Sequence, residues 1–232
     1  MKTRTSKTLG AAAGIAAIVA SLPLAIAANA DTPTPTPTTP EAPIPDPQGS
    51  GCDAFKTALP NWKDFATKPV GTVLASIPDI STFNSLLSGQ ANPAVNVVDV
   101  INNGPYVIFA PTNEAFATMA PGQLDAIKTD PAALYKLVYY HMFLGLLGPD
   151  DLHGQRPTQQ GAEINVTGKG GDIKVNDTAK EVCGGIQASN ARIYMIDAVL
   201  DPAQSPAPLT PTSTSSTSAT TTTTTTSPPP PG

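Results

Sequence analysis

The stretch YVIFAPTNEAF, residues 106–116, decides the fold of this chain. Its first four residues form a continuous apolar run bounded by Pro105 and Pro111, which is typical of a short buried strand. Thr112 is a residue type that caps helices, and Glu114 suits the positive end of the helix that follows. The stretch therefore predicts a buried strand that turns directly into a helix.

Four other segments carry apolar residues or capping residues that are typical of helices. Residues 80–87 form the first segment, which Gly89 ends, and residues 97–101 form the second, which ends at an Asn-Asn-Gly sequence. Asn and Gly tolerate the positive φ angles at which helices commonly stop. Two more helices are expected after the signature stretch, a short one at 123–128 and a longer one at 130–138.

The pattern changes from helical to β in the C-terminal half. The chain is expected to become a strand beyond Tyr139, and the β pattern is continuous from Arg156 onward. Residues 162–166 and 173–175 alternate on either side of a glycine-rich turn, which predicts a hairpin, and residues 193–196 form the last strand. Helices early and strands late predict an α+β domain, not a parallel α/β domain.

The first thirty residues have the pattern of a secretory signal peptide, 1–30. Three basic residues precede an apolar stretch at 9–27, and Ala28-Asn29-Ala30 forms a cleavage site before Asp31. A membrane anchor is the alternative, because the apolar stretch approaches the roughly 20 residues that span a bilayer. We expect cleavage, since the stretch is mostly Ala and Gly and contains Pro23.

Two arms of biased composition flank one domain, residues 51–202. The first arm, 31–50, contains seven of the 26 prolines, and the second, 203–232, is almost wholly Ala, Pro, Ser and Thr. Neither arm can bury enough apolar surface to offset the entropy of ordering it, so both are expected to be disordered. They are interpreted as linkers or stalks that let the domain stand off from a cell wall, with O-linked sugar as an open alternative to inert tails.

The charge of the domain restricts the class of partner. Residues 51–202 contain ten Lys or Arg and fifteen Asp or Glu, so their net charge is −5. Such a chain has no electrostatic footprint for nucleic acid or anionic lipid. We expect a monomer without stable membrane insertion after cleavage, and partners that are proteins, glycans or neutral ligands.

Cys52 and Cys183 are the only cysteines and lie at opposite ends of the domain. An even pair in a chain predicted to leave the cytoplasm indicates a disulfide, which would join the first turn of the domain to a late strand. Metal binding is the weaker alternative, because two distant thiols and two histidines, His141 and His153, make a poor ligand set. We therefore expect no metal site and no cofactor.

Three motifs, in order, resemble those of the fasciclin-like domain family. Residues 106–116 resemble its first signature, Tyr140-His-Met-Phe-Leu-Gly145 resembles its Tyr-His motif, and residues 193–200 resemble its closing strand. The similarity covers nearly all of 51–202 and looks most like the single-domain secreted mycobacterial fasciclin-like antigens. It implies a β-sandwich wedge with several helices packed on one side. Leu144 departs from the family pattern, in which a proline is common at this position.

The resemblance also implies an adhesive role. Members of the family bind cell-surface proteins or matrix components, and no catalytic mechanism is general to them. The Tyr-His motif makes Tyr140 and His141 candidate partner-binding residues. The favoured alternative is that His141 is buried and hydrogen-bonded within the wedge. A single domain weakens avidity, so adhesion follows less firmly than the fold.

The sequence contains no recognised catalytic motif. No Gly-x-Ser-x-Gly elbow is present, and the glycine-rich run 168–171 lacks the length and the Ser or Thr of a phosphate loop. Helix capping and loop closure explain Asn113 and Glu114 without a substrate. N-glycosylation sequons begin at Asn165 and Asn176, and they matter only in a host with that machinery.

These patterns together predict a non-enzymatic binding module that is secreted or cell-surface exposed, with association with the cell wall left open. Two alternatives remain open at this point. One is a carrier of a small apolar ligand such as a lipid, held between the sheet and the helices. The other is a structural component of the cell wall.

Overall fold

The computed structural model describes residues 43–208. The predicted signal peptide and most of both predicted arms lie outside these residues. The α-helices are α1 (Cys52–Ala58), α2 (Val70–Ser76), α3 (Ser81–Leu87), α4 (Val98–Asn102), α5 (Asn113–Ala117), α6 (Gln123–Thr129) and α7 (Pro131–Tyr140). Short 3-10 helices span Trp62–Thr67 (η1), Pro78–Ile80 (η2) and Pro202–Gln204 (η3). The strands are β1 (Tyr106–Pro111), β2 (Met142–Leu144), β3 (Gly154–Pro157), β4 (Glu163–Thr167), β5 (Lys174–Val175), β6 (Ala179–Gln187) and β7 (Ala191–Ile196).

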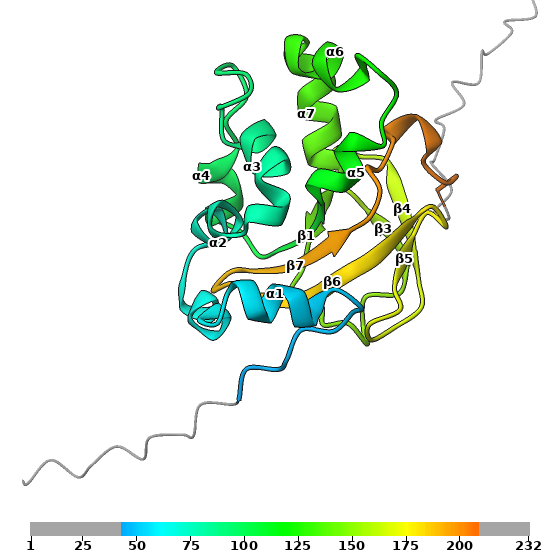
Figure 1. The fold of residues 1–232 in the computed structure, drawn as a ribbon. Coiled ribbons are helices and arrows are strands. Elements are labelled where there is room, and N and C mark those ends of the chain that lie inside the picture. Colours follow the sequence, from blue (N-terminus) through cyan, green and yellow to red (C-terminus); the bar gives the residue numbers. More distant parts are fainter. Residues whose placement is uncertain (1–42, 209–232) are drawn as a thin grey trace, which may run out of the picture. The chain divides into compact units, whose positions relative to one another are not determined.

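The strands form one seven-stranded sheet in the order β2-β1-β7-β6-β5-β4-β3 (Figure 1). Every neighbouring pair is antiparallel except β1 and β7, which run parallel with Tyr106 opposite Ala191 and Pro111 opposite Ile196. The mixed sheet with several helices confirms the predicted α+β class. The signature strand β1 is buried at all six positions, as its apolar run predicts.

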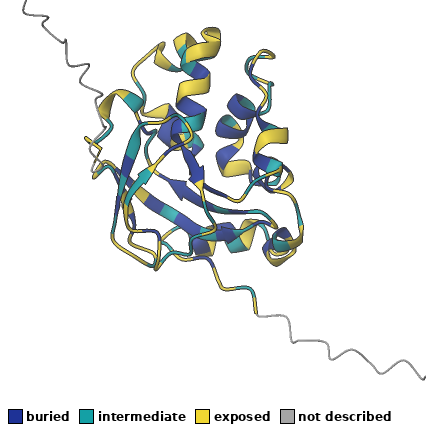
Figure 2. Cartoon of the chain, turned by 180° about the vertical axis from the view of Figure 1, so that it is seen from behind, coloured by how far each residue is buried: buried dark blue, intermediate teal, exposed yellow. Residues whose placement is uncertain are grey.

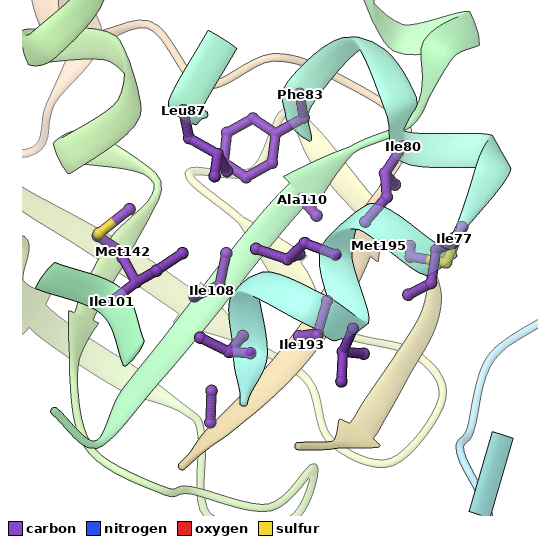
Figure 3. Close-up of a cluster of buried hydrophobic side chains, with 14 of the residues drawn as sticks. Ile77, Ile80, Phe83, Leu87, Ile101, Ile108, Ala110, Met142, Ile193 and Met195 are labelled. Carbon is purple, nitrogen blue, oxygen red and sulfur yellow. The ribbon is translucent and has the colours of Figure 1, made fainter. Parts of the chain in front are cut away.

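One face of the central strands packs against the helices. Strand residues alternate between the two faces of a sheet, and the even-numbered positions of β1 point to the helical side. The same cluster contains the odd-numbered positions 193 and 195 of β7. Figure 3 shows these side chains with those of the helical layer, which include Ile77, Ile80, Phe83, Leu87 and Ile101.

The opposite face of β1 and β7 packs against the far half of the same sheet. Val107 and Phe109 share a second buried cluster with Ile164 and Val166 of β4. The sheet therefore bends over itself, and a hydrogen bond from the Gln159 backbone N–H to the Met142 carbonyl, 2.8 Å long, links the β3 end to edge strand β2. This two-layered arrangement, with helices outside one layer, is the expected sandwich-like wedge. Figure 2 shows the buried strands in the middle and exposed outer surfaces on the helices.

The helix boundaries follow from side chains that satisfy free backbone groups. Thr112 caps α5 by accepting a hydrogen bond from the Ala115 N–H at 3.2 Å. Asp130 caps α7 by accepting from the Ala132 N–H at 2.9 Å. Both caps confirm the boundaries expected from the sequence. Helices α1 and α2, and the parallel pairing of β1 with β7, were not predicted from it.

A disulfide joins Cys52 in α1 to Cys183 in β6, with the two Cα atoms 4.9 Å apart. This confirms the predicted bridge between the first turn of the domain and a late strand. The chain beside it is also tied to β6, because the backbone of Gln48 exchanges hydrogen bonds of 2.9 and 2.8 Å with Gly184. Ordered contacts thus begin before residue 51, and the domain limits 51–202 stay a prediction.

Candidate functional site

The Tyr-His motif lies at the point where α7 ends and β2 begins. Tyr140 is the last residue of α7 and His141 is its C-cap, so the strand that was expected beyond Tyr139 begins only at Met142. The helix continues through Tyr140 because Leu137 and Val138 are buried on its inner face, and this packing outweighs the preference of tyrosine for strands. Both side chains of the motif are fully buried, with 0% of their surface exposed.

His141 connects α7 to the segment that follows β7. Its Nδ1 lies 2.8 Å from the Leu137 carbonyl oxygen, and its Nε2 lies 3.0 Å from the Leu200 backbone nitrogen. The Leu200 N–H can only donate, so Nε2 must be the unprotonated nitrogen and Nδ1–H donates to Leu137. The geometry therefore requires a neutral ring in one tautomer.

Burial keeps the His141 ring neutral. It lowers the pKa of His141 from its ordinary value of 6.5 to about 4, while the hydrogen bond to the Leu137 carbonyl acts in the opposite direction. The ring of Phe83 lies beside it, with the ring centroids 5.6 Å apart. A charged imidazole would be unfavourable in this apolar environment and could no longer accept the hydrogen bond from Leu200.

Tyr140 connects the same helix end to the other half of the sheet. Its hydroxyl donates to the Glu163 carbonyl oxygen at 3.1 Å and accepts from the Asn176 side-chain amide at 2.9 Å. The Asn176 side-chain oxygen in turn accepts from the Asn165 N–H at 2.8 Å. Burial raises the pKa of Tyr140, although the bond from Asn176 lowers it.

The Tyr-His pair therefore forms a polar junction, defined here as Tyr140 and His141 with their hydrogen-bond partners. Tyr140 fixes α7 to β4 and to the β5–β6 turn, and His141 fixes it to the segment after β7. In this conformation neither side chain offers surface to a partner. The predicted role of the pair in partner contact stays a prediction. The Asn176 amide nitrogen is part of the junction, so a glycan at this sequon would displace its bond to Tyr140.

Asn113 of the first motif has a structural role of the same kind. Its side-chain oxygen accepts from the Thr82 N–H and its amide donates to the Pro78 carbonyl, each at 2.9 Å. It thus joins the start of α5 to the start of α3, which agrees with the loop-closure interpretation. Glu114 is exposed.

A buried carboxyl group that was not singled out from the sequence lies in β6. Glu181 is 6% exposed; its Oε2 accepts from the Ile173 N–H at 3.2 Å, and its Oε1 has no hydrogen-bond partner among the described residues. Burial raises the pKa of Glu181 to about 8, against the effect of the Ile173 bond. Its position two residues after the buried Ala179 was the available signal, because strand residues two apart face the same side, and the first register shift of β6 comes after it, between Glu181 and Cys183.

Within residues 43–208, no three His, Cys, Asp or Glu side chains are grouped so that they could hold a metal ion. No helix in the same range is long and apolar enough to cross a membrane. The two histidines do not form a shared site, because His141 is buried and His153 is exposed. The Nδ1 atom of His153 lies 3.1 Å from the Asp150 carbonyl oxygen.

The fold and the junction define a disulfide-closed α+β wedge whose motif side chains serve internal bonding. A model of the fasciclin domain matches residues 78–202, and the chain belongs to the fasciclin domain family. It is 40% identical over 158 residues to the immunogenic protein MPB70 of Mycobacterium bovis, covering 66% of this chain and 81% of that protein. It is equally identical over 158 residues to the cell surface glycolipoprotein MPB83 of the same species, covering 71% of that protein.

Two more distant similarities are also found. Protein sll1483 of Synechocystis is 29% identical over 141 residues, which cover 59% of this chain and 77% of that protein. Among solved structures, a FAS1 domain pair from the insect cell adhesion molecule fasciclin I matches with a TM-score of 0.38 and 22% identity. The match covers 53% of this chain and 45% of that chain, and at this score it adds nothing to the assignment.

Proposed function

We propose that this protein is a non-enzymatic binding module of the cell exterior, which recognises protein or glycan partners through its folded domain. Membership of the fasciclin domain family supports the proposal, together with relatives that are named as immunogenic and as cell-surface proteins. The observation that carries its non-enzymatic part is the polar junction, because the polar atoms of Tyr140 and His141 all form hydrogen bonds within the protein.

The chemistry of the buried groups supports a role without catalysis. A general base must reach its substrate and have a pKa near the working pH. His141 has no exposed surface, and both of its ring nitrogens are engaged. Glu181 is also buried, and its raised pKa keeps it protonated near neutral pH. Neither group is placed to act on a substrate from solvent.

The contact surface that we propose lies next to the junction. Leu144, the last residue of edge strand β2, is 59% exposed, and Leu146 is 45% exposed. Exposed apolar side chains that gather beside an edge strand are typical of interaction surfaces. The junction fixes the end of α7, and the strand that carries Leu144 starts two residues later, at Met142. On this proposal Tyr140 and His141 position the contact surface and do not touch the partner.

The test is binding of the full secreted chain to arrays of extracellular matrix proteins and of glycans. We expect Leu144→Ser to lose binding without a change in melting temperature. Val100→Ser is the matched control, because Val100 is an apolar residue that is 45% exposed on another element, α4. Binding that survives Leu144→Ser, or that a peptide of residues 209–232 reproduces by itself, would contradict the proposal.

A further inference from the structure

A cleft of about 660 Å³ opens between the helices α5, α6 and α7 and the segment 198–204 that follows β7. We call it the α7 cleft. Figure 1 shows this segment, in orange, passing beside α5. The volume lies within the range of small-molecule sites, which is roughly 300–1,000 Å³.

The lining of the α7 cleft is about as polar as it is apolar, and we call its apolar part the floor. It includes Met119, Ile127, Leu137 and Leu200. Leu137 and Leu200 are the two residues whose backbones bond to the ring of His141, at 2.8 and 3.0 Å. The buried histidine therefore fixes α7 relative to the segment after β7, so a ligand meets a preformed site.

The wall opposite α7 is fixed as well. Asp201 caps η3, with its carboxylate accepting from the Ala203 N–H at 2.9 Å and from the Gln204 side-chain amide at 3.0 Å. Both carboxylate oxygens thus already have donors. Both donors are neutral, so the carboxylate keeps its negative charge, and a carboxylate head group would be held at Lys136 and not at this wall.

Lys136 provides the opposite charge in the cleft lining. Unlike Lys56 and Lys128, which pair with Asp53 and Asp125, it has no acidic side chain within 4.0 Å among residues 43–208. An ammonium group beside an apolar floor has the chemistry to hold the head of a molecule whose tail lies on the floor.

We propose that the α7 cleft binds a single-chain aliphatic carboxylate, with its chain over the partly exposed Met119 and Ile127, beside Leu137 and Leu200, and its head group at Lys136. This site is separate from the contact surface at Leu144, so the two can succeed or fail independently. It assigns a place and a ligand chemistry to the carriage of a small apolar ligand.

The test is a titration of the disulfide-intact chain with decanoate, below its micelle concentration, followed by amide chemical shifts in NMR. We expect saturable shifts confined to the cleft, including Leu137 and Leu200. Decyltrimethylammonium, with the same tail and the opposite charge, is expected to bind more weakly. Equal binding of the two amphiphiles, or shifts that are absent or centred outside the cleft, would overturn the proposal.

Two pairs of variants distinguish the cleft from non-specific binding. Ala133→Phe places a ring in the cleft and should weaken binding by about tenfold or more, whereas Ala132→Phe lies on the same helix outside the lining and should not. Lys136→Gln should weaken binding by roughly two- to fivefold, which is the range for an exposed ion pair, whereas Lys128→Gln should not. Equal effects within either pair, in variants with unchanged circular dichroism, would also overturn it.

Discussion

Acidification should weaken the domain through His141. The pKa of this ring is about 4 in the folded protein, against an ordinary value of 6.5, because burial disfavours its charged form. The unfolded chain therefore binds more protons between these two values, and stability falls as pH decreases from 6.5 to 4. The difference of about 2.5 pKa units corresponds to about 3 kcal/mol of unfolding free energy.

The structure names the contacts through which this loss acts. Protonation of Nε2 removes the acceptor of the Leu200 N–H and leaves two buried donors, Nε2–H and the Leu200 N–H, facing each other. The segment after β7 should then detach from α7 before the sheet unfolds. Amide exchange at Leu200 should accelerate as pH falls relative to that of Phe109 in β1, whose N–H bonds to the His141 carbonyl oxygen at 2.8 Å.

The assay is urea unfolding of the native chain and of His141→Gln at several pH values from 4 to 7. Glutamine can still donate to Leu137 and accept from Leu200, and it does not titrate in this range. The variant should be less stable at pH 7, and its deficit should shrink by about 3 kcal/mol by pH 4. His153→Gln is the matched control for loss of an imidazole. A deficit of His141→Gln that stays constant with pH would refute the reasoning.

Three further changes have defined outcomes. Cys52→Ala with Cys183→Ala opens a covalent link across 131 residues and should lower the free energy of unfolding by about 2–5 kcal/mol in urea titrations, with no further effect of reductant. The folded state keeps Glu181 protonated to a higher pH than the unfolded chain does, so the native chain should lose stability on the order of 4 kcal/mol as pH rises from 4.5 to 8. Glu181→Gln should remove this loss. Stability curves of the two proteins that run parallel with pH would contradict this. A side chain at Gly184 would overlap the Glu181 carboxylate and the Tyr194 ring, so Gly184→Ala should cost about 3 kcal/mol or more in thermal unfolding, and a native melting temperature would contradict this.

The parts of the fold that depend on neighbouring residues were predictable from the sequence. The strand at 106–109, the cap at Thr112 and the helix start at Asp130 each follow from patterns within a few residues, and the structure confirms them. The disulfide was predictable because only two cysteines exist and their chemistry leaves few alternatives.

The parts that depend on distant residues were not predictable in the same way. The parallel pairing of β1 and β7 joins residues such as Tyr106 and Ala191, and no short pattern encodes that partnership. The end of α7 was misplaced because Tyr139 and Tyr140 favour strands by propensity, whereas buried contacts extend the helix. The α7 cleft was also invisible, since its floor combines Leu137 with Leu200, which meet only through the ring between them.

The link between the two ends of the bent sheet affects how copies of this protein behave together. An open sheet normally exposes a row of free backbone groups on each outer strand, and these groups can recruit a strand from another molecule. Here one outer strand has only three residues, Met142–Leu144, and Gln159 from beyond the other outer strand already occupies its first carbonyl. Little unpaired backbone is therefore left on β2, so this edge gives a strand of another copy few groups with which to pair.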